Sequence, residues 1–216
     1  MSEAIFITGI DTDAGKTYAT AYYARLLGRK GYSVITQKFI QTGCTGSSED
    51  IEAHRRLLGT GILPEDRLGL TAPIIFSYPA SAQLAARIDG KEIDLGLISR
   101  STDELLTRYD RVLIEGAGGL FVPIFDDYFA IDYVTEHKLP AVLTVNSRLG
   151  SINHTILSLE AIKSRGIDLR AIIYNEHFDD DAEIAADTKA FVARYIGRHF
   201  PDTEFLVMPE YDAWDV

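Results

Sequence analysis

The chain has 216 residues, 46% of them hydrophobic, and its 32 acidic against 21 basic residues give a formal net charge of −11. This size predicts one globular domain over residues 1–216, and the negative charge argues against a nucleic acid or an anionic membrane as a partner. The single cysteine, Cys44, excludes an intrachain disulfide, and no apolar run is long enough for a membrane-spanning helix. We therefore expect a cytoplasmic protein.

Short β-branched runs alternate with helical periodicity along the whole chain, which is typical of an α/β fold. Strands are predicted at residues 4–8, 33–38, 111–115, 141–146, 169–175 and 205–208. Helices are predicted at residues 15–30, 50–58, 79–88, 95–108, 128–137, 151–165 and 181–198. This order predicts a mostly parallel sheet with helices on both faces, the arrangement of a P-loop NTPase.

The first predicted strand leads into residues 9–17, with the sequence GIDTDAGKT, which open the first predicted helix. Glycines let such a loop curl with its backbone N–H groups toward phosphate oxygens, while a lysine reaches the terminal phosphates and a hydroxyl binds Mg²⁺. Gly15, Lys16 and Thr17 supply these groups, although five residues separate the two glycines where four are usual. The segment predicts a phosphate-binding loop, and its added carboxylates suit an acceptor substrate that carries an amine.

Lys38 lies at the end of the second predicted strand, before a small polar loop at residues 41–43. Ligands of open parallel sheets bind beyond the carboxyl ends of the strands, so a lysine there can neutralise a transferring phosphoryl group or an acceptor carbamate. An ordinary surface lysine at a strand exit explains the same pattern, and the sequence does not choose between the two interpretations.

Two carboxylates are candidates for a metal site. Glu115 ends a buried predicted strand and precedes residues 116–119, GAGG, a run that lets the backbone approach a ligand closely. Asp50 opens a predicted helix, where capping or complementing the helix dipole is its default role. Together with Thr17 they would give one hydroxyl and two carboxylates, which are hard oxygen ligands suited to Mg²⁺.

These segments, together with residues 149–154 (LGSINH), resemble the dethiobiotin synthase family in the same order and at similar spacing. The resemblance runs from about residue 5 to residue 209. Its departures include Phe39, where the family usually has proline, and a loop of different length before Asp50. It implies an ATP- and Mg²⁺-dependent cyclo-ligase that forms the ureido ring of dethiobiotin from 7,8-diaminononanoate and CO₂. The amine takes up CO₂ as a carbamate, ATP converts this to a carbamic-phosphoric anhydride, and the second amine closes the ring.

The resemblance also implies roles for individual residues. Lys16 and Lys38 would be catalytic, and Thr17, Asp50 and Glu115 would hold Mg²⁺. The implied ATP-binding residues are Asp13, Ala14, Gly15, Lys16, Thr17, Tyr18, Asp50, Glu115, Gly116, Ala117, Gly118, Asn175, Glu176, Pro209, Glu210 and Tyr211. The implied substrate-binding residues are Thr12, Lys38, Thr42, Gly118, Leu149, Gly150, Ser151, Ile152 and Asn153. The contact from residues 150–153, the start of a helix whose N–H groups would bind the substrate carboxylate, would come from the partner subunit of a homodimer.

Two other functions share this type of loop. Amide-forming synthases that act on cobyrinate usually carry a glutamine-hydrolysing domain with a nucleophilic cysteine, and Cys44 in a short chain does not fit that role. Partitioning or scaffold ATPases typically place a second lysine early in the loop, and residues 10–14 contain none. Both alternatives are therefore disfavoured by the sequence.

Overall fold

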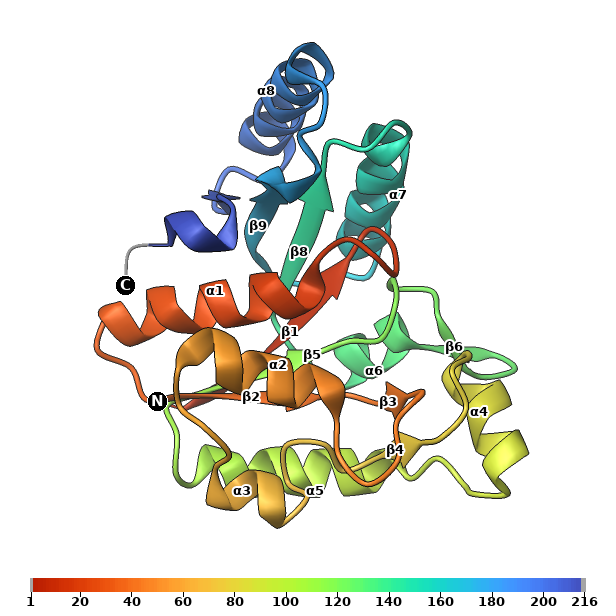
Figure 1. The fold of residues 1–216 in the computed structure, drawn as a ribbon. Helices are drawn as coiled ribbons and strands as arrows, with labels where there is room; N and C mark the ends of the chain where they lie inside the picture. The colour runs from red at the N-terminus through yellow and green to blue at the C-terminus, as the bar shows by residue number, and fades with distance from the viewer. Residues whose placement is uncertain (1, 215–216) are drawn as a thin grey trace.

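The computed structural model describes residues 2–214 (Figure 1), so Met1 and residues 215–216 of the predicted domain lie outside the described residues. Its centre is a six-stranded sheet of order β10-β9-β8-β1-β5-β2 in which every neighbouring pair is parallel. The strands are β1 (Glu3–Gly9), β2 (Val34–Lys38), β5 (Arg111–Glu115), β8 (Ala141–Asn146), β9 (Leu169–Asn175) and β10 (Glu204–Met208). The six strands predicted from the sequence are confirmed, each to within one residue at either end.

Eight α-helices accompany the sheet in the described part of the chain. They are α1 (Lys16–Arg29), α2 (Glu49–Leu58), α3 (Pro64–Arg67), α4 (Ala82–Asp89), α5 (Leu95–Leu106), α6 (Ala130–Glu136), α7 (Ser151–Ser164) and α8 (Ala182–His199). Ile5 and Ile7 of β1 pack with α1 on one face of the sheet, and α2 lies against α1. Phe6 points to the other face, where α5 and α6 cover it, and α7 and α8 continue this layer over β8 and β9. Among the described residues, no helix combines the length and hydropathy needed to cross a bilayer.

Short strands account for most differences from the predicted elements. The predicted helix at residues 128–137 is wrong at its start, because Tyr128–Phe129 form β7 and pair antiparallel with β6 (Pro123–Phe125). The helix begins only at Ala130, where the Asp132 carboxylate accepts a hydrogen bond from the Phe129 N–H at 2.8 Å. A second pair, β3 (Gln41–Thr42) with β4 (Ile75–Phe76), was also not predicted. Strands of two or three residues are too short to give a periodic signal.

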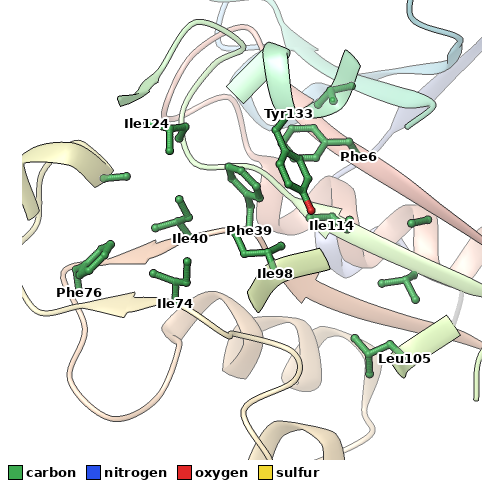
Figure 2. Packing of buried hydrophobic residues seen from close by; sticks show 14 of the residues in the cluster. Phe6, Phe39, Ile40, Ile74, Phe76, Ile98, Leu105, Ile114, Ile124 and Tyr133 are labelled. Atoms are coloured by element: carbon green, nitrogen blue, oxygen red, sulfur yellow. The ribbon is translucent and has the colours of Figure 1, made fainter. Parts of the chain in front are cut away.

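Phe39 lies in the core and not at the site. Its ring packs edge-on against Phe6, with centroids 5.5 Å apart, and against Tyr133 at 4.8 Å (Figure 2). Its backbone N–H donates to the Glu115 carbonyl oxygen at 2.8 Å, a bond that a proline at this position could not make. The departure from the family pattern therefore adds an apolar side chain to the core and a hydrogen bond between the ends of β2 and β5.

Candidate nucleotide and phosphoryl-transfer site

The phosphate loop sits between the end of β1 and the start of α1, as the sequence predicts. Gly15 has φ +89°, in the left-handed region, and a Cβ at this position would lie 2.2 Å from Asn175 Nδ2. That amide nitrogen donates to the Ala14 carbonyl oxygen at 3.2 Å, and the amide oxygen accepts from the His177 N–H at 3.1 Å. The end of β9 therefore holds the loop in its curled conformation through a single side chain.

Lys16 is folded back into this curl. Its Nζ donates to the carbonyl oxygens of Asp11 and Thr12, both at 2.8 Å, and the side chain is buried. Burial lowers the pKa of Lys16 to about 8, although the carboxylate of Glu115 opposes the shift. The ammonium thus points into the loop, where the terminal phosphates of a bound nucleotide are expected.

Lys38, Asp50 and Glu115 meet next to the loop. Lys38 Nζ lies 2.6 Å from Asp50 Oδ2 and 2.8 Å from Glu115 Oε1, and it also donates to the Gly116 carbonyl oxygen at 3.2 Å. Only 5% of Lys38 is exposed, so its interpretation as an ordinary surface lysine is wrong. Asp50 is not the cap of α2, because Ser48 is the N-cap and its Oγ accepts from the Ile51 N–H at 3.2 Å. Asp50 does lie in the first turn, where a carboxylate complements the helix dipole.

The charges in this cluster stabilise one another against burial. Burial by itself would lower the pKa of Lys38, but the carboxylates of Glu115 and Asp50 outweigh it and raise the pKa. Burial would likewise raise the pKa of Glu115, but the Lys38 charge and a hydrogen bond from His54 outweigh it and hold the pKa well below its usual range. Lys38 and Glu115 are therefore both ionised at neutral pH.

Three hard oxygens converge at the mouth of the loop. Thr17 Oγ1 lies 3.2 Å from Glu115 Oε1 and 3.4 Å from Asp50 Oδ1. Within residues 2–214, no group of three or more His, Cys, Asp or Glu side chains gathers to hold a metal ion. Mg²⁺ does not require one, since it usually takes one or two carboxylates and completes its octahedron with water and phosphate oxygens. The donor set therefore fits Mg²⁺ bound together with a nucleotide.

A cavity of about 550 Å³ extends from this cluster. Most predicted nucleotide and substrate residues line it: Thr12, Asp13, Gly15, Lys16, Thr17, Tyr18, Lys38, Thr42, Asp50, Glu115, Ala117, Gly118, Asn175, Pro209, Glu210 and Tyr211. Part of the wall is aromatic, with Tyr18, Phe178, Tyr211 and Trp214, and the Arg148 guanidinium lies over the Phe178 ring at 3.9 Å. The cavity therefore combines charged side chains beside the phosphate loop with aromatic side chains that suit a base.

The remaining predicted residues lie outside this cavity. Ala14 and Gly116 are buried behind its wall, and Glu176 forms an ion pair with Lys189. Four residues at the start of α7 border a separate cavity of about 390 Å³ beside α8: Leu149, Gly150, Ser151 and Ile152. The next residue, Asn153, is exposed. Within one chain, the segment at residues 149–153 is therefore not part of the larger cavity.

Sequence reasoning missed several residues of the site. Arg148, His177, Phe178 and Trp214 line the cavity from loops or short turns that carry no motif. His54, inside α2, is fully buried, and its Nε2 lies 2.7 Å from Glu115 Oε2. The only available signal was proximity in sequence to predicted residues such as Asn175 and Asp50, which does not fix where a side chain points.

Solved structures share this fold at low sequence identity. A ParA family ATPase from Chlorobium tepidum TLS gives a TM-score of 0.55 at 18% identity, covering 97% of this chain and 86% of the other. The pNOB8 ParA bound to nonspecific DNA also gives 0.55, at 15% identity, covering 96% and 85%. These matches confirm the predicted P-loop NTPase fold, and at this identity they show the fold alone.

Sequence comparison decides the family. A family model described as an AAA domain matches residues 3–202. The chain is 45% identical to ATP-dependent dethiobiotin synthetase BioD 2 of Pasteurella multocida, over 96% of this chain and 98% of that protein. The corresponding protein of Haemophilus ducreyi is 47% identical over 96% and 99%, and BioD of Chlorobaculum tepidum is 48% identical over 91% and 82%. The chain belongs to the ATP-dependent dethiobiotin synthetase family.

Membership in the dethiobiotin synthetase family confirms the resemblance read from the motifs. The partitioning ATPases share the fold at 15–18% identity, whereas dethiobiotin synthetases match at 45–48% over most of the chain. The family assignment therefore comes from sequence comparison. The fold by itself would not have given it.

Proposed function

We propose that this protein is an ATP- and Mg²⁺-dependent dethiobiotin synthetase, which closes the ureido ring of dethiobiotin from 7,8-diaminononanoate and CO₂. The observation that carries the proposal is the meeting of Lys16, Lys38 and Glu115 at one end of a single cavity, in a chain of this family. Two lysines and a carboxylate beside a phosphate loop are the groups that phosphoryl transfer to an anionic acceptor requires.

ATP would bind with its phosphates on the loop and its base against the aromatic wall. The backbone N–H groups of the curl and Lys16 would hold the β- and γ-phosphates. Asn175 lines the cavity, and it would contact the base while keeping its bond to Ala14. Tyr211 and Phe178 would then cover the base, since aromatic rings stack on any heterocycle.

Mg²⁺ would be held by Thr17, Asp50 and Glu115 and would neutralise charge on the phosphates. Lys38 contacts both of these carboxylates, so its ammonium would lie next to the place where the γ-phosphate and the acceptor meet. From there it would stabilise negative charge on both the carbamate and the transferring phosphoryl group.

The reaction needs no covalent enzyme intermediate. One amine of the substrate adds to CO₂ and loses a proton to give a carbamate. A carbamate oxygen attacks the γ-phosphorus and ADP leaves, forming a carbamic-phosphoric anhydride. The second amine attacks the carbamoyl carbon, inorganic phosphate leaves, and the ring closes with loss of a proton. Each step develops negative charge on oxygen, which Lys16 and Lys38 would stabilise.

The substrate carboxylate would bind at the start of α7 in a homodimer. Gly150 has φ +93° and is the N-cap of a 14-residue helix. The Ser151 N–H donates to the Arg148 carbonyl oxygen at 2.9 Å, so the N–H groups of Ile152 and Asn153 would bind the anion. Leu149, just before this helix, is 94% exposed and Leu157 within it is 61% exposed, as expected for a surface that a second subunit covers. In this arrangement the segment at residues 149–153 of one subunit would complete the site of the other.

The test is diamine dependence. Purified protein with Mg²⁺, ATP and bicarbonate should release ADP only when 7,8-diaminononanoate is added, with one dethiobiotin formed per ADP. ATP hydrolysis at a comparable rate without the diamine would instead favour a nucleotide-switched ATPase, which the ParA-like fold also accommodates.

A further inference from the structure

We propose that His54 is a positioning residue that orients the Glu115 carboxylate toward Thr17 and the bound metal, an inference that rests on the proposed function of this site. His54 Nε2 lies 2.7 Å from Glu115 Oε2. The other oxygen, Oε1, faces Lys38 Nζ at 2.8 Å and Thr17 Oγ1 at 3.2 Å. The two oxygens of one carboxylate are thus divided between a histidine on one side and the reactive cluster on the other.

The position of His54 separates it from the ligands themselves. The side chain is fully buried and does not line the cavity, whereas Glu115, Lys38 and Thr17 all do. His54 therefore stands behind Glu115 and can influence a ligand only through that carboxylate. An ionised carboxylate has no hydrogen to donate, so the hydrogen of this contact is on His54 Nε2. The bond restrains rotation about the terminal torsion of the Glu115 side chain, which otherwise has a broad distribution of angles.

The second imidazole nitrogen supports this interpretation. Within the described residues, Nδ1 of His54 is buried and has no hydrogen-bond partner. A buried polar atom without a partner is destabilising, and an apolar side chain would avoid that cost. For packing alone, histidine is therefore a poor choice at this position. The bond from Nε2 to Glu115 is the contact that an apolar side chain could not replace.

Helix geometry links His54 to the other metal-site carboxylate. Asp50 and His54 are four residues apart in α2 and so lie on the same face, one turn from each other. From this face Asp50 reaches Lys38 at 2.6 Å and His54 reaches Glu115. The start of α2 is itself fixed by Ser48, whose Oγ donates to Gln41 Oε1 at 2.5 Å. One helix face therefore sets the positions of both carboxylates relative to Thr17.

Two substitutions separate positioning from packing. His54→Gln keeps an N–H donor that can reach Glu115, and His54→Leu fills a similar volume without a donor. Loss of a partner behind a metal-binding carboxylate typically weakens metal affinity or activity by about 10–100-fold. We therefore expect His54→Leu to raise the Mg²⁺ concentration for half-maximal ADP release by about 10-fold or more, and His54→Gln to stay within about 3-fold of the wild type.

A binding measurement gives a readout that does not depend on turnover. Mn²⁺ bound with a non-hydrolysable ATP analogue is followed by electron paramagnetic resonance, with thermal unfolding of each variant measured alongside. The expected order of Mn²⁺ affinity is wild type, then His54→Gln close behind, then His54→Leu. Wild-type affinity in His54→Leu would overturn the proposal, and so would equal losses in both variants, because equal losses mean packing. If His54→Leu does not fold, His54→Met replaces it as the variant without a donor.

The two proposals can fail separately. Absence of diamine-dependent ADP release from the wild type would refute the synthetase function, yet the Mn²⁺ affinities would still test the role of His54. Conversely, an active wild type with an unaltered His54→Leu variant would leave the synthetase function standing and remove the positioning role.

Discussion

Lys38 and Glu115 are partners in the parallel register of β2 and β5, and their side chains form a buried ion pair of 2.8 Å between Nζ and Oε1. The exposed fraction is 6% for the Lys38 side chain and 1% for that of Glu115, so neither charge is solvated once the other is removed. The same ion pair therefore joins β2, at the edge of the sheet, to β5 and holds two charged groups of the site in place.

The first prediction follows from this pair. Lys38→Met alone should lower the free energy of unfolding of the ligand-free protein by about 3–5 kcal/mol, because it leaves the buried Glu115 carboxylate without its cation. Glu115→Gln alone should lower it less, because Lys38 keeps its ion pair with Asp50. Lys38→Met leaves two carboxylates without their cation, so it should be the more damaging change. The double variant should lose less than the sum of the two, as measured by urea unfolding in a double-mutant cycle. Strictly additive losses would show that the two side chains do not interact.

Lys16→Ala should lower diamine-dependent ADP release by about 10²-fold or more, since a charge that stabilises the transferring phosphoryl group is lost. Lys30→Ala is a matched control, because Lys30 lies at the far end of α1 and its side chain is 56% exposed. Steady-state assays of both variants check the prediction. Turnover by Lys16→Ala equal to that of the control would remove Lys16 from the catalytic site.

Gly15→Ala should abolish binding of a non-hydrolysable ATP analogue. The backbone at Gly15 has φ +89°, and the added methyl group would lie 2.2 Å from Asn175 Nδ2, so the loop or β9 must shift. Gly31→Ala is the matched control, because Gly31 has φ +91° with no atom within 4 Å of the added carbon. Both variants should lose about 1 kcal/mol or more of stability from the left-handed backbone, but only Gly15→Ala should lose binding in calorimetry. Normal binding by Gly15→Ala would show that the curl tolerates a side chain.

Asp66 should make stability depend on acidic pH. Burial would raise the pKa of Asp66, but hydrogen bonds from Arg55, the Leu63 N–H and Thr71 outweigh it and lower the pKa below 3.8. A group with a lowered pKa in the folded state stabilises the protein above its unfolded pKa, and this stabilisation is lost as the pH falls through the folded pKa. The free energy of unfolding should therefore decrease below about pH 4, in part through this residue.

Asp66→Asn tests that contribution. Arg55 binds Asp66 through Nε at 2.9 Å and Nη2 at 2.7 Å and is itself buried, so the variant should be less stable at pH 7 by about 3 kcal/mol. Its stability should also change less than that of the wild type between pH 5 and pH 3, as measured by urea unfolding at each pH. An equal pH dependence in the two proteins would assign the acid sensitivity to other carboxyl groups.

Some of this molecule is determined by local sequence. The phosphate loop was predicted because its glycines, lysine and hydroxyl are consecutive and fix their own backbone and direction. The six central strands were predicted because β-branched runs buried on both faces contrast with the amphipathic helices between them. Even Lys38 and Glu115 could be placed at one edge, since the ends of parallel strands come together whatever the details of packing.

The tertiary structure determined which side chains of distant segments contact one another. Whether Lys38 is a surface residue or a buried partner of Glu115 depends on the register of β2 with β5, which no local pattern encodes. His54 looks like any helix residue, and it becomes significant only because α2 packs so that it meets a carboxylate 61 residues away. Local propensity fixes the elements, but the contacts between side chains depend on packing across the whole core.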